Sequence, residues 1–292
     1  MNYSDLLNGA YDIHVHSSPD LIPRSNDPLI LLKEARKAKM AGILLKDHTT
    51  ATVGRTYVLN QHEHSDFRFF SSLCLNPPVG DLNLSAVESS IREGVDVVFF
   101  PTYGARHHIS VWGAGKPPTA FPFSNASPTG VSILNHDGRL KEECRRILHM
   151  LADHDTVLAT GHISPEESLE LIREADLLGC RKIVVTHASE SVTQMSPSQQ
   201  KHAVKMGAYI EHCFFAVTST CPNPISLEEI RDQIRYIGVE HCILSSDFGQ
   251  IHNPPPVEGF STYLEKMKQI GFSQEEIRQM VRENPNTLLG KV

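Results

Sequence analysis

Short apolar runs alternate along the whole chain with longer stretches in which apolar and polar residues are mixed. Several of the runs are almost continuously apolar, which is typical of strands that helices cover on both faces. The mixed stretches begin with helix caps, as in Ser164-Pro165-Glu166-Glu167, and glycines such as Gly179 follow several of them. We expect strands at residues 11–16, 42–48, 67–75, 95–100, 156–162, 182–187, 208–213 and 241–247.

This alternation predicts the fold class. Eight strands that alternate with helices within 292 residues match a (β/α)8 TIM barrel of the α/β class. An open, doubly wound sheet is the alternative, but no glycine-rich dinucleotide loop follows the first strand, where the chain reads His14-Val15-His16-Ser17-Ser18. The sequence contains neither an internal repeat nor a linker, so residues 1–292 are predicted to form a single barrel domain.

Residues 101–139 interrupt the alternation. They are rich in glycine, proline, serine and aromatic residues, and they include Trp112, the only tryptophan. A loop of this length usually has a function or is disordered. We expect a lid-like insertion over the carboxyl ends of the strands, with a surface excursion or a subunit contact as the alternative.

Composition indicates which kinds of partner and which cellular location to expect. The chain has 27 basic and 34 acidic residues and a formal net charge of −7, so neither nucleic acid nor an anionic membrane is expected as its main partner. No apolar run approaches the roughly 18 residues of a membrane span. The first residues show no signal-peptide pattern, so a cytoplasmic location is expected. The six cysteines lack CxxC spacing and are expected to be reduced core residues.

Histidine is abundant, with 16 residues, and its positions point to a metal. Taken alone, a histidine at a strand end is more often structural than a ligand. Here, however, the carboxyl ends of parallel strands meet at one mouth of a barrel, and several imidazoles with a carboxylate are costly to bury there unless a divalent ion holds them. The predicted ligands stand at the ends of the first, second, fifth, sixth and eighth strands, and they are His14, His16, His48, His162, His187 and Asp247.

This ordered set resembles the amidohydrolase superfamily of metal-dependent hydrolases. The resemblance rests on His14-x-His16, His162, His187 and Asp247, and it extends to the closing segment 283–290, ENPNTLLG. It implies a distorted (β/α)8 barrel with one or two divalent ions at its mouth. We expect Zn²⁺, with Mn²⁺, Fe²⁺ or Ni²⁺ as alternatives.

The chain departs from the superfamily at the fourth strand. Two-metal members usually have a carboxylated lysine there, whereas this chain reads Phe99-Phe100-Pro101-Thr102. Lys46 stands instead on the second strand, in phase with His48. Either these two residues take over the bridging and second-metal roles, or the site holds a single ion. Lys46 could also form an ion pair with its neighbour Asp47.

The resemblance suggests a role for each candidate. Asp247 would act as the general base for a metal-activated water, and His187 would polarise the substrate or serve as a ligand. Asp12 and Glu211 are candidates to orient the ligands. Candidates to bind a small-molecule substrate, anionic ones included, lie on the loops after strands one, two and four, and they are Arg24, Arg55, Arg106, His107 and His108.

Several functions remain open from the sequence. The first is a metal-dependent hydrolase of an amide, cyclic amide, lactone or ester, and the second is a mononuclear metal-dependent decarboxylase or lyase, which the missing lysine favours. A metal-dependent phosphoesterase and a barrel that binds without turnover are the others. No Gly-x-Ser-x-Gly motif is present, which argues against a serine nucleophile. Association into a homo-oligomer is left open.

Overall fold

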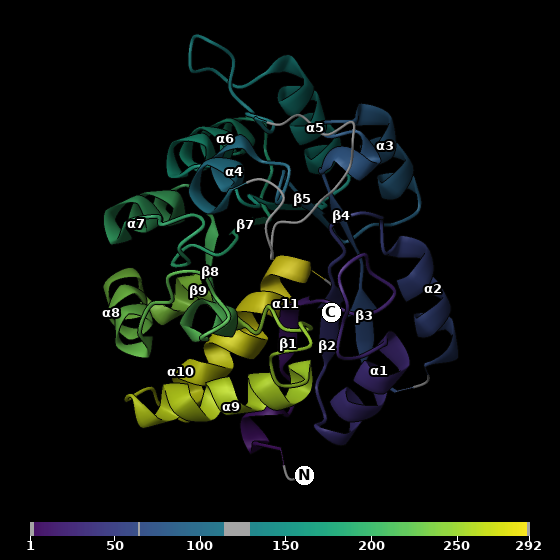
Figure 1. The fold of residues 1–292 in the computed structure, drawn as a ribbon, viewed down its shortest axis with the longest axis vertical. Helices are drawn as coiled ribbons and strands as arrows, with labels where there is room; N and C mark the ends of the chain where they lie inside the picture. Colours follow the sequence, from purple (N-terminus) through teal and green to yellow (C-terminus); the bar gives the residue numbers. More distant parts are fainter. Residues whose placement is uncertain (1–2, 64, 114–128, 291–292) are drawn as a thin grey trace.

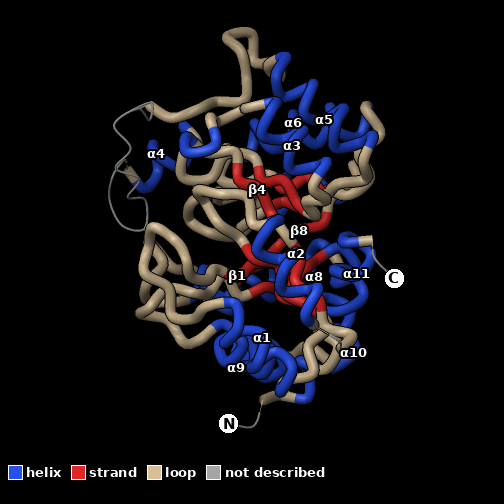
Figure 2. The backbone as a smooth tube through the Cα atoms, turned by 90° about the vertical axis from the view of Figure 1, so that its right-hand side faces the viewer, coloured by secondary structure: helices blue, strands red, loops and turns tan. Residues whose placement is uncertain are grey.

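A computed structural model describes residues 3–63, 65–113 and 129–290. Short parallel strands form the centre, and helices surround them (Figure 1; Figure 2). The strands are β1 (Tyr11–Val15), β2 (Gly42–Leu45), β3 (Arg68–Phe70), β4 (Ser72–Cys74), β5 (Val97–Phe99), β6 (Val157–Ala159), β7 (Ile183–Val185), β8 (Tyr209–Cys213) and β9 (Cys242–Ser245). The α-helices are α1 (Pro28–Lys37), α2 (Val53–His62), α3 (Leu84–Arg92), α4 (Arg106–Trp112), α5 (Glu142–Asp153), α6 (Pro165–Leu177), α7 (Pro197–Lys205), α8 (Leu227–Ile237), α9 (Pro256–Gln269), α10 (Gln274–Arg278) and α11 (Asn284–Leu289).

The expected third strand, 67–75, is divided at Ser71 into β3 and β4. Ser71 N–H donates to the side chain of Asp96 at 2.7 Å, which takes it out of the ladder with β2. β3 therefore pairs with β2, and β4 pairs with β5. Counted as one strand with a break, β3 and β4 complete the predicted set of eight.

The barrel closes between its first and last strands. The Asp247 amide donates to the His14 carbonyl at 2.9 Å, and the His16 amide donates to the Phe248 carbonyl at 2.8 Å. A parallel bridge joins Val15 to Phe248 between them. The ring therefore runs from β1 through β9 and back to β1, and the predicted (β/α)8 class is confirmed.

The helix caps predicted from the sequence form as expected. Four helices begin with a complete capping box, in which the cap serine and the residue three positions later exchange hydrogen bonds with each other's backbone. Their cap residues are Ser164, Ser196, Ser226 and Ser273. Such caps fix where each helix starts, and therefore how long each loop at the barrel mouth can be.

Two apolar cores hold the barrel together. The larger core lies between the strands and the surrounding helices, and the smaller one fills the interior with inward residues such as Ile13, Leu44 and Phe99. Leu288 and Leu289 of α11 pack into that inner core. None of the helices in the described residues is long and apolar enough to cross a membrane.

The predicted insertion, 101–139, is described at both of its ends. α4 follows β5, and the amide of Val131 donates to the carbonyl of Gly104 at 2.8 Å, so the two ends lie side by side. Residues 114–128 lie outside the described residues, and a lid role for that part stays a prediction. Trp112, at the end of α4, lines the cavity at the barrel mouth.

Candidate metal centre

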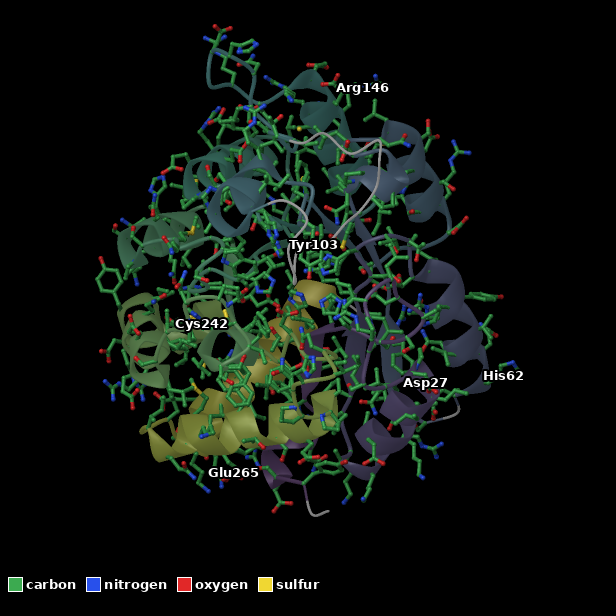
Figure 3. All side chains as sticks on the ribbon, viewed as in Figure 1. Asp27, His62, Tyr103, Arg146, Cys242 and Glu265 are labelled. Atoms are coloured by element: carbon green, nitrogen blue, oxygen red, sulfur yellow. The ribbon has the colours of Figure 1, made fainter. Side chains whose placement is uncertain are left out.

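A cavity opens where the carboxyl ends of the strands converge. Tyr103, labelled within the ring of helices in Figure 3, is one of the residues that surround it. The full lining is His16, Ile22, Arg24, Lys46, His48, Tyr103, Trp112, His162, His187, Glu190, Phe215, Asp247 and Gln250. Residues more than 200 positions apart in the sequence, such as His16 and Asp247, therefore meet here.

Three of the predicted ligands form a compact group at the floor of this cavity. Asp247 Oδ1 lies 3.2 Å from His14 Nε2 and 3.1 Å from His16 Nε2. All three side chains are buried, and their donor atoms could share one ion. Burial lowers the pKa of both histidines well below its usual range, so the rings are neutral and can offer a lone pair.

Unusual backbone conformations place two of the candidate residues. His187 and Asp247 each have a φ of 53°, a left-handed conformation that is uncommon for residues other than glycine. Gly249 has a φ of 139°, and a Cβ there would lie 2.1 Å from the His16 carbonyl oxygen. Only glycine therefore lets the loop after β9 approach His16 this closely.

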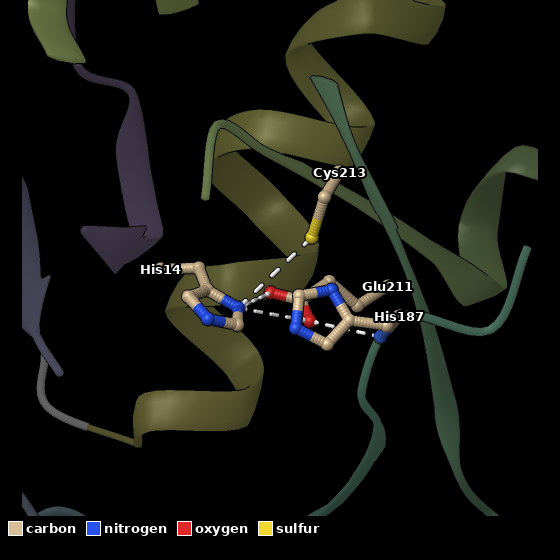
Figure 4. A group of neighbouring side chains, drawn as sticks. All are labelled: His14, His187, Glu211 and Cys213. Atoms are coloured by element: carbon tan, nitrogen blue, oxygen red, sulfur yellow. Dashed lines mark hydrogen bonds and ion pairs between the residues drawn. The ribbon is translucent and has the colours of Figure 1, made fainter. Parts of the chain in front are cut away.

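Glu211 on β8 fixes the orientation of His14 (Figure 4). Its carboxylate lies 3.1 Å from His14 Nδ1, and it also accepts hydrogen bonds from the Ser245 hydroxyl at 2.7 Å and the His187 amide at 3.3 Å. If Nδ1–H of His14 donates to Glu211, Nε2 carries the lone pair that faces Asp247. This is the arrangement by which carboxylates usually orient metal-binding imidazoles.

Cys213 completes the group drawn in Figure 4, with its sulfur 4.0 Å from His14 Nδ1. Burial raises the pKa of this thiol well above its usual range, with the charge of Glu211 adding to the effect. Its sulfur also lies 3.4 Å from the Ser245 hydroxyl, and with His14, His187 and Glu211 it forms a second buried group of possible ligand atoms.

Lys46 points into the site rather than towards Asp47. Its Nζ lies 2.8 Å from His14 Nε2 and 4.6 Å from the centre of the Phe99 ring. Asp47 is paired instead with Arg55, at 3.1 Å. An ammonium group and a divalent ion cannot both use the lone pair of His14 Nε2, so an ion that binds here requires Lys46 to move aside or to lose its proton.

Glu190 is a site residue that sequence reasoning missed. Its Oε2 lies 3.0 Å from His187 Nδ1, while His187 Nε2 faces Asp247 Oδ2 at 3.8 Å. Burial raises the pKa of Glu190 to about 8 and that of Asp247 to about 7, although His187 opposes the shift of Asp247. The only signal in the sequence was that Glu190 stands three positions after His187.

His48 and His162 lie in the cavity wall, outside the compact group. His48 Nδ1 is 2.9 Å from the Thr102 hydroxyl, and its ring stacks on that of His16 with centroids 4.8 Å apart. His162 Nδ1 lies 2.8 Å from Nδ1 of the fully buried His108. Nε2 of His162 is buried without a hydrogen-bond partner in the described part of the chain.

The contact between His108 and His162 leads to a testable prediction. One Nδ1 must donate and the other accept, so His108 can hold His162 as the tautomer whose Nε2 lone pair faces the cavity. We expect His108→Leu to weaken metal binding by roughly 10- to 100-fold, as is common when a residue that orients a ligand is lost. His108→Asn should largely restore the affinity, because its amide oxygen can take the place of Nδ1.

Calorimetric titration of zinc into the apoprotein measures this affinity, and His107→Leu is the matched control on the same helix. Nitrogen-15 shifts of the His162 ring report its tautomer directly. Equal zinc affinity in wild type and His108→Leu would show that His108 does not position His162.

Of the candidates for substrate binding, only Arg24 lines the cavity. Arg24 lines the cavity, and its guanidinium is paired with Asp20. Arg55 reaches Asp47 and the Pro19 carbonyl, and Arg106 is exposed at the start of α4. Neither of these arginines lines the cavity, and nor do His107 and His108. Besides Glu190, the lining residues that the sequence reasoning left out include Tyr103, Phe215 and Gln250.

The residues present fit a divalent ion. The compact group offers two neutral imidazole nitrogens and a carboxylate oxygen, a donor set that Zn²⁺ and related ions accept. His162 Nε2 adds a buried nitrogen that lines the same cavity and has no protein partner among the described residues. Lys46 is the residue that such an ion would have to displace.

Comparison with known proteins bears on the family and on the fold. The sequence profile of a family of unknown function (DUF6282) matches residues 9–211. No curated protein matched the chain. Among solved structures, an amidohydrolase from Pseudomonas aeruginosa is 13% identical with a TM-score of 0.67, and the alignment covers 98% of this chain and 96% of that one.

Two further structures are similar over nearly their full length. A putative 2-pyrone-4,6-dicarboxylic acid hydrolase from Pseudomonas putida is 13% identical with a TM-score of 0.57, covering 97% of each chain. A 2,6-dihydroxybenzoate decarboxylase from Rhizobium is 12% identical with a TM-score of 0.57, covering 97% of this chain and 99% of that one. At these identities the likeness concerns the fold, and the fold expected from the resemblance to the amidohydrolase superfamily is confirmed.

Proposed function

The chain belongs to the family of unknown function DUF6282, and we propose that it is a metal-dependent hydrolase that cleaves an amide, cyclic amide, lactone or ester bond of a small molecule. The observation that carries the proposal is the buried group of His14, His16 and Asp247 on the floor of the mouth cavity. Enzymes with this fold have their active sites at that mouth.

His14, His16 and Asp247 would hold the ion, with His162 or His187 as a further ligand. We expect zinc, with manganese, iron or nickel as alternatives. A divalent ion supplies Lewis acidity and lowers the pKa of water from about 15.7 towards 7. Glu211 contributes by keeping His14 in the tautomer that offers Nε2.

Asp247 would act as the base and then as the acid. Its carboxylate would accept a proton from the attacking water and then return that proton to the leaving group. Its Oδ2 faces the cavity side of His187 rather than the group at the floor. One carboxylate oxygen can thus serve the ion while the other handles the proton.

His187 would polarise the substrate's carbonyl oxygen. Glu190 Oε2 lies 3.0 Å from His187 Nδ1 and would hold the ring so that Nε2 can face an oxygen in the cavity. Lys46 would take the bridging role that the sequence suggested for it, once its Nζ has left His14 Nε2.

A decarboxylase or lyase is the second candidate. It is favoured by Phe99, which stands on β5 where a bridging lysine would be expected in a two-ion centre. His187, which lies between the carboxyl groups of Glu190 and Asp247, could also deliver a proton to a carbon atom after loss of CO2. The two candidates differ in product, since only the second releases CO2.

The test is a turnover assay on purified protein before and after removal of its metal. We expect esters or lactones of small acids to be hydrolysed, the activity to disappear on dialysis against a chelator, and zinc to restore it. Ring carboxylic acids are assayed in parallel for CO2 release, which would select the second candidate. Hydrolysis that survives complete loss of metal would contradict both.

A further inference from the structure

We propose that Arg24, together with the aromatic residues beside it, binds the carboxylate of a small planar ring acid. This deepens the proposed function, on which it rests, by naming the class of substrate. Arg24 is the one arginine that lines the mouth cavity among the described residues, and its side chain is only 2% exposed. A buried cation that faces a cavity needs a counter-charge, so its surroundings decide what it can bind.

Arg24 is held in place through both its side chain and its backbone. Its Nε donates to Asp20 Oδ2 at 2.7 Å, and Asp20 Oδ1 in turn accepts the Ile22 amide at 3.2 Å. The backbone of Arg24 forms an antiparallel bridge with Gln250, a lining residue on the loop after β9. The guanidinium is therefore fixed before any ligand arrives, which reduces the entropy lost on binding.

Asp20 leaves part of the guanidinium unused. Nη2 lies 2.7 Å from the same oxygen of Asp20, but outside hydrogen-bond geometry, and it is buried without a hydrogen-bond partner among the described residues. A guanidinium has five N–H groups arranged to meet a planar carboxylate with two parallel hydrogen bonds. Nη2 of Arg24, which makes no hydrogen bond of normal geometry among the described residues, can thus donate to a second carboxylate.

The other walls of the cavity suit a flat, apolar body. Ile22, Tyr103, Trp112 and Phe215 line it together with Arg24. The Tyr103 ring stacks on His48 with centroids 4.0 Å apart, and Trp112 Nε1 donates to the Ser191 hydroxyl at 3.2 Å, so both rings are held in place. Fixed aromatic faces favour a planar ring over a flexible chain.

The subsite offers one guanidinium and a set of apolar and aromatic side chains. Arg24 lines the cavity together with Ile22, Tyr103, Trp112 and Phe215. A carboxylate is matched in shape and charge by one planar guanidinium. We therefore assign the subsite to a monocarboxylate on a planar ring.

Calorimetry with benzoate tests the assignment, in both zinc-loaded and metal-free protein, because a carboxylate could also bind the metal. We expect benzoate to bind, and benzamide and cyclohexanecarboxylate to bind about tenfold more weakly or worse. Arg24→Gln should raise the benzoate Kd by about tenfold or more in both forms of the protein. Arg92→Gln, which changes an exposed arginine on α3 outside the cavity, should leave it within about twofold.

Arg24→Gln leaves Asp20 buried without its cation, so the double variant Asp20→Asn, Arg24→Gln is measured beside it, with thermal unfolding as the check on folding. Benzoate binding that is absent in wild type up to about 10 mM, equal for benzamide, or unchanged in a folded Arg24 variant overturns the subsite. If that happens while zinc-dependent ester hydrolysis persists, the proposed function stands without it. Loss of Arg24-dependent binding and loss of hydrolysis are therefore separate results.

Discussion

Replacing His14 and His16 together with alanine is expected to remove the bound metal almost completely. The two side chains supply both imidazole nitrogens of the compact group, and Asp247 alone offers a single carboxylate. Metal content should fall from near one ion per chain to about a tenth or less, since affinity depends on the number and geometry of the ligands. Elemental analysis of protein purified by gel filtration in metal-free buffer measures this content.

The matched control is the double variant His149→Ala, His154→Ala. It removes two histidines that are exposed on and just after α5 and do not line the cavity, and its metal content should equal that of wild type. Circular dichroism of both variants checks the fold. A His14, His16 variant that is folded and still carries the wild-type amount of metal would show that the ligands have been assigned wrongly.

Asp247→Asn is expected to lower turnover by a factor of about 10² or more while the protein stays folded and keeps its metal. The amide retains an oxygen for the ion, but it cannot accept a proton from water or return one to the leaving group. The readouts are kcat on the best ester or lactone from the assay above and metal content by elemental analysis.

Asp137→Asn serves as the control, because this substitution makes the same chemical change away from the cavity. Asp137 is exposed in the loop before α5. Its kcat should not change. If Asp247→Asn retained the wild-type kcat, the base would have to be another group, and His187 would be tested next by the same comparison.

Local sequence was sufficient to predict the secondary structure. Every expected strand contains an observed one, because continuous apolar runs mark strands that are buried on both faces. The serine caps define where helices such as α6 and α7 begin, since their side chains satisfy amides within the same turn. Both signals act over a few residues, so no knowledge of the rest of the chain was needed.

The candidate site was predicted less completely. That His14, His16 and Asp247 would meet followed from the sequence, because each stands at the end of a strand and the closed barrel brings such ends together. Glu190 was missed because it lies in a loop after β7, and loops carry no periodicity that shows which way a side chain points. Tyr103, in the loop after β5, escaped for the same reason.

The sequence by itself determined where strands and helices form and which side chains stand at the strand ends, because those features depend on neighbours a few positions away. The tertiary structure alone decided the pairings across the barrel: Glu211 with His14, Lys46 with His14 rather than Asp47, and the split of the third strand by the side chain of Asp96. Each of these joins segments 25 or more positions apart, and their contact exists only once the chain has folded and brought those segments together.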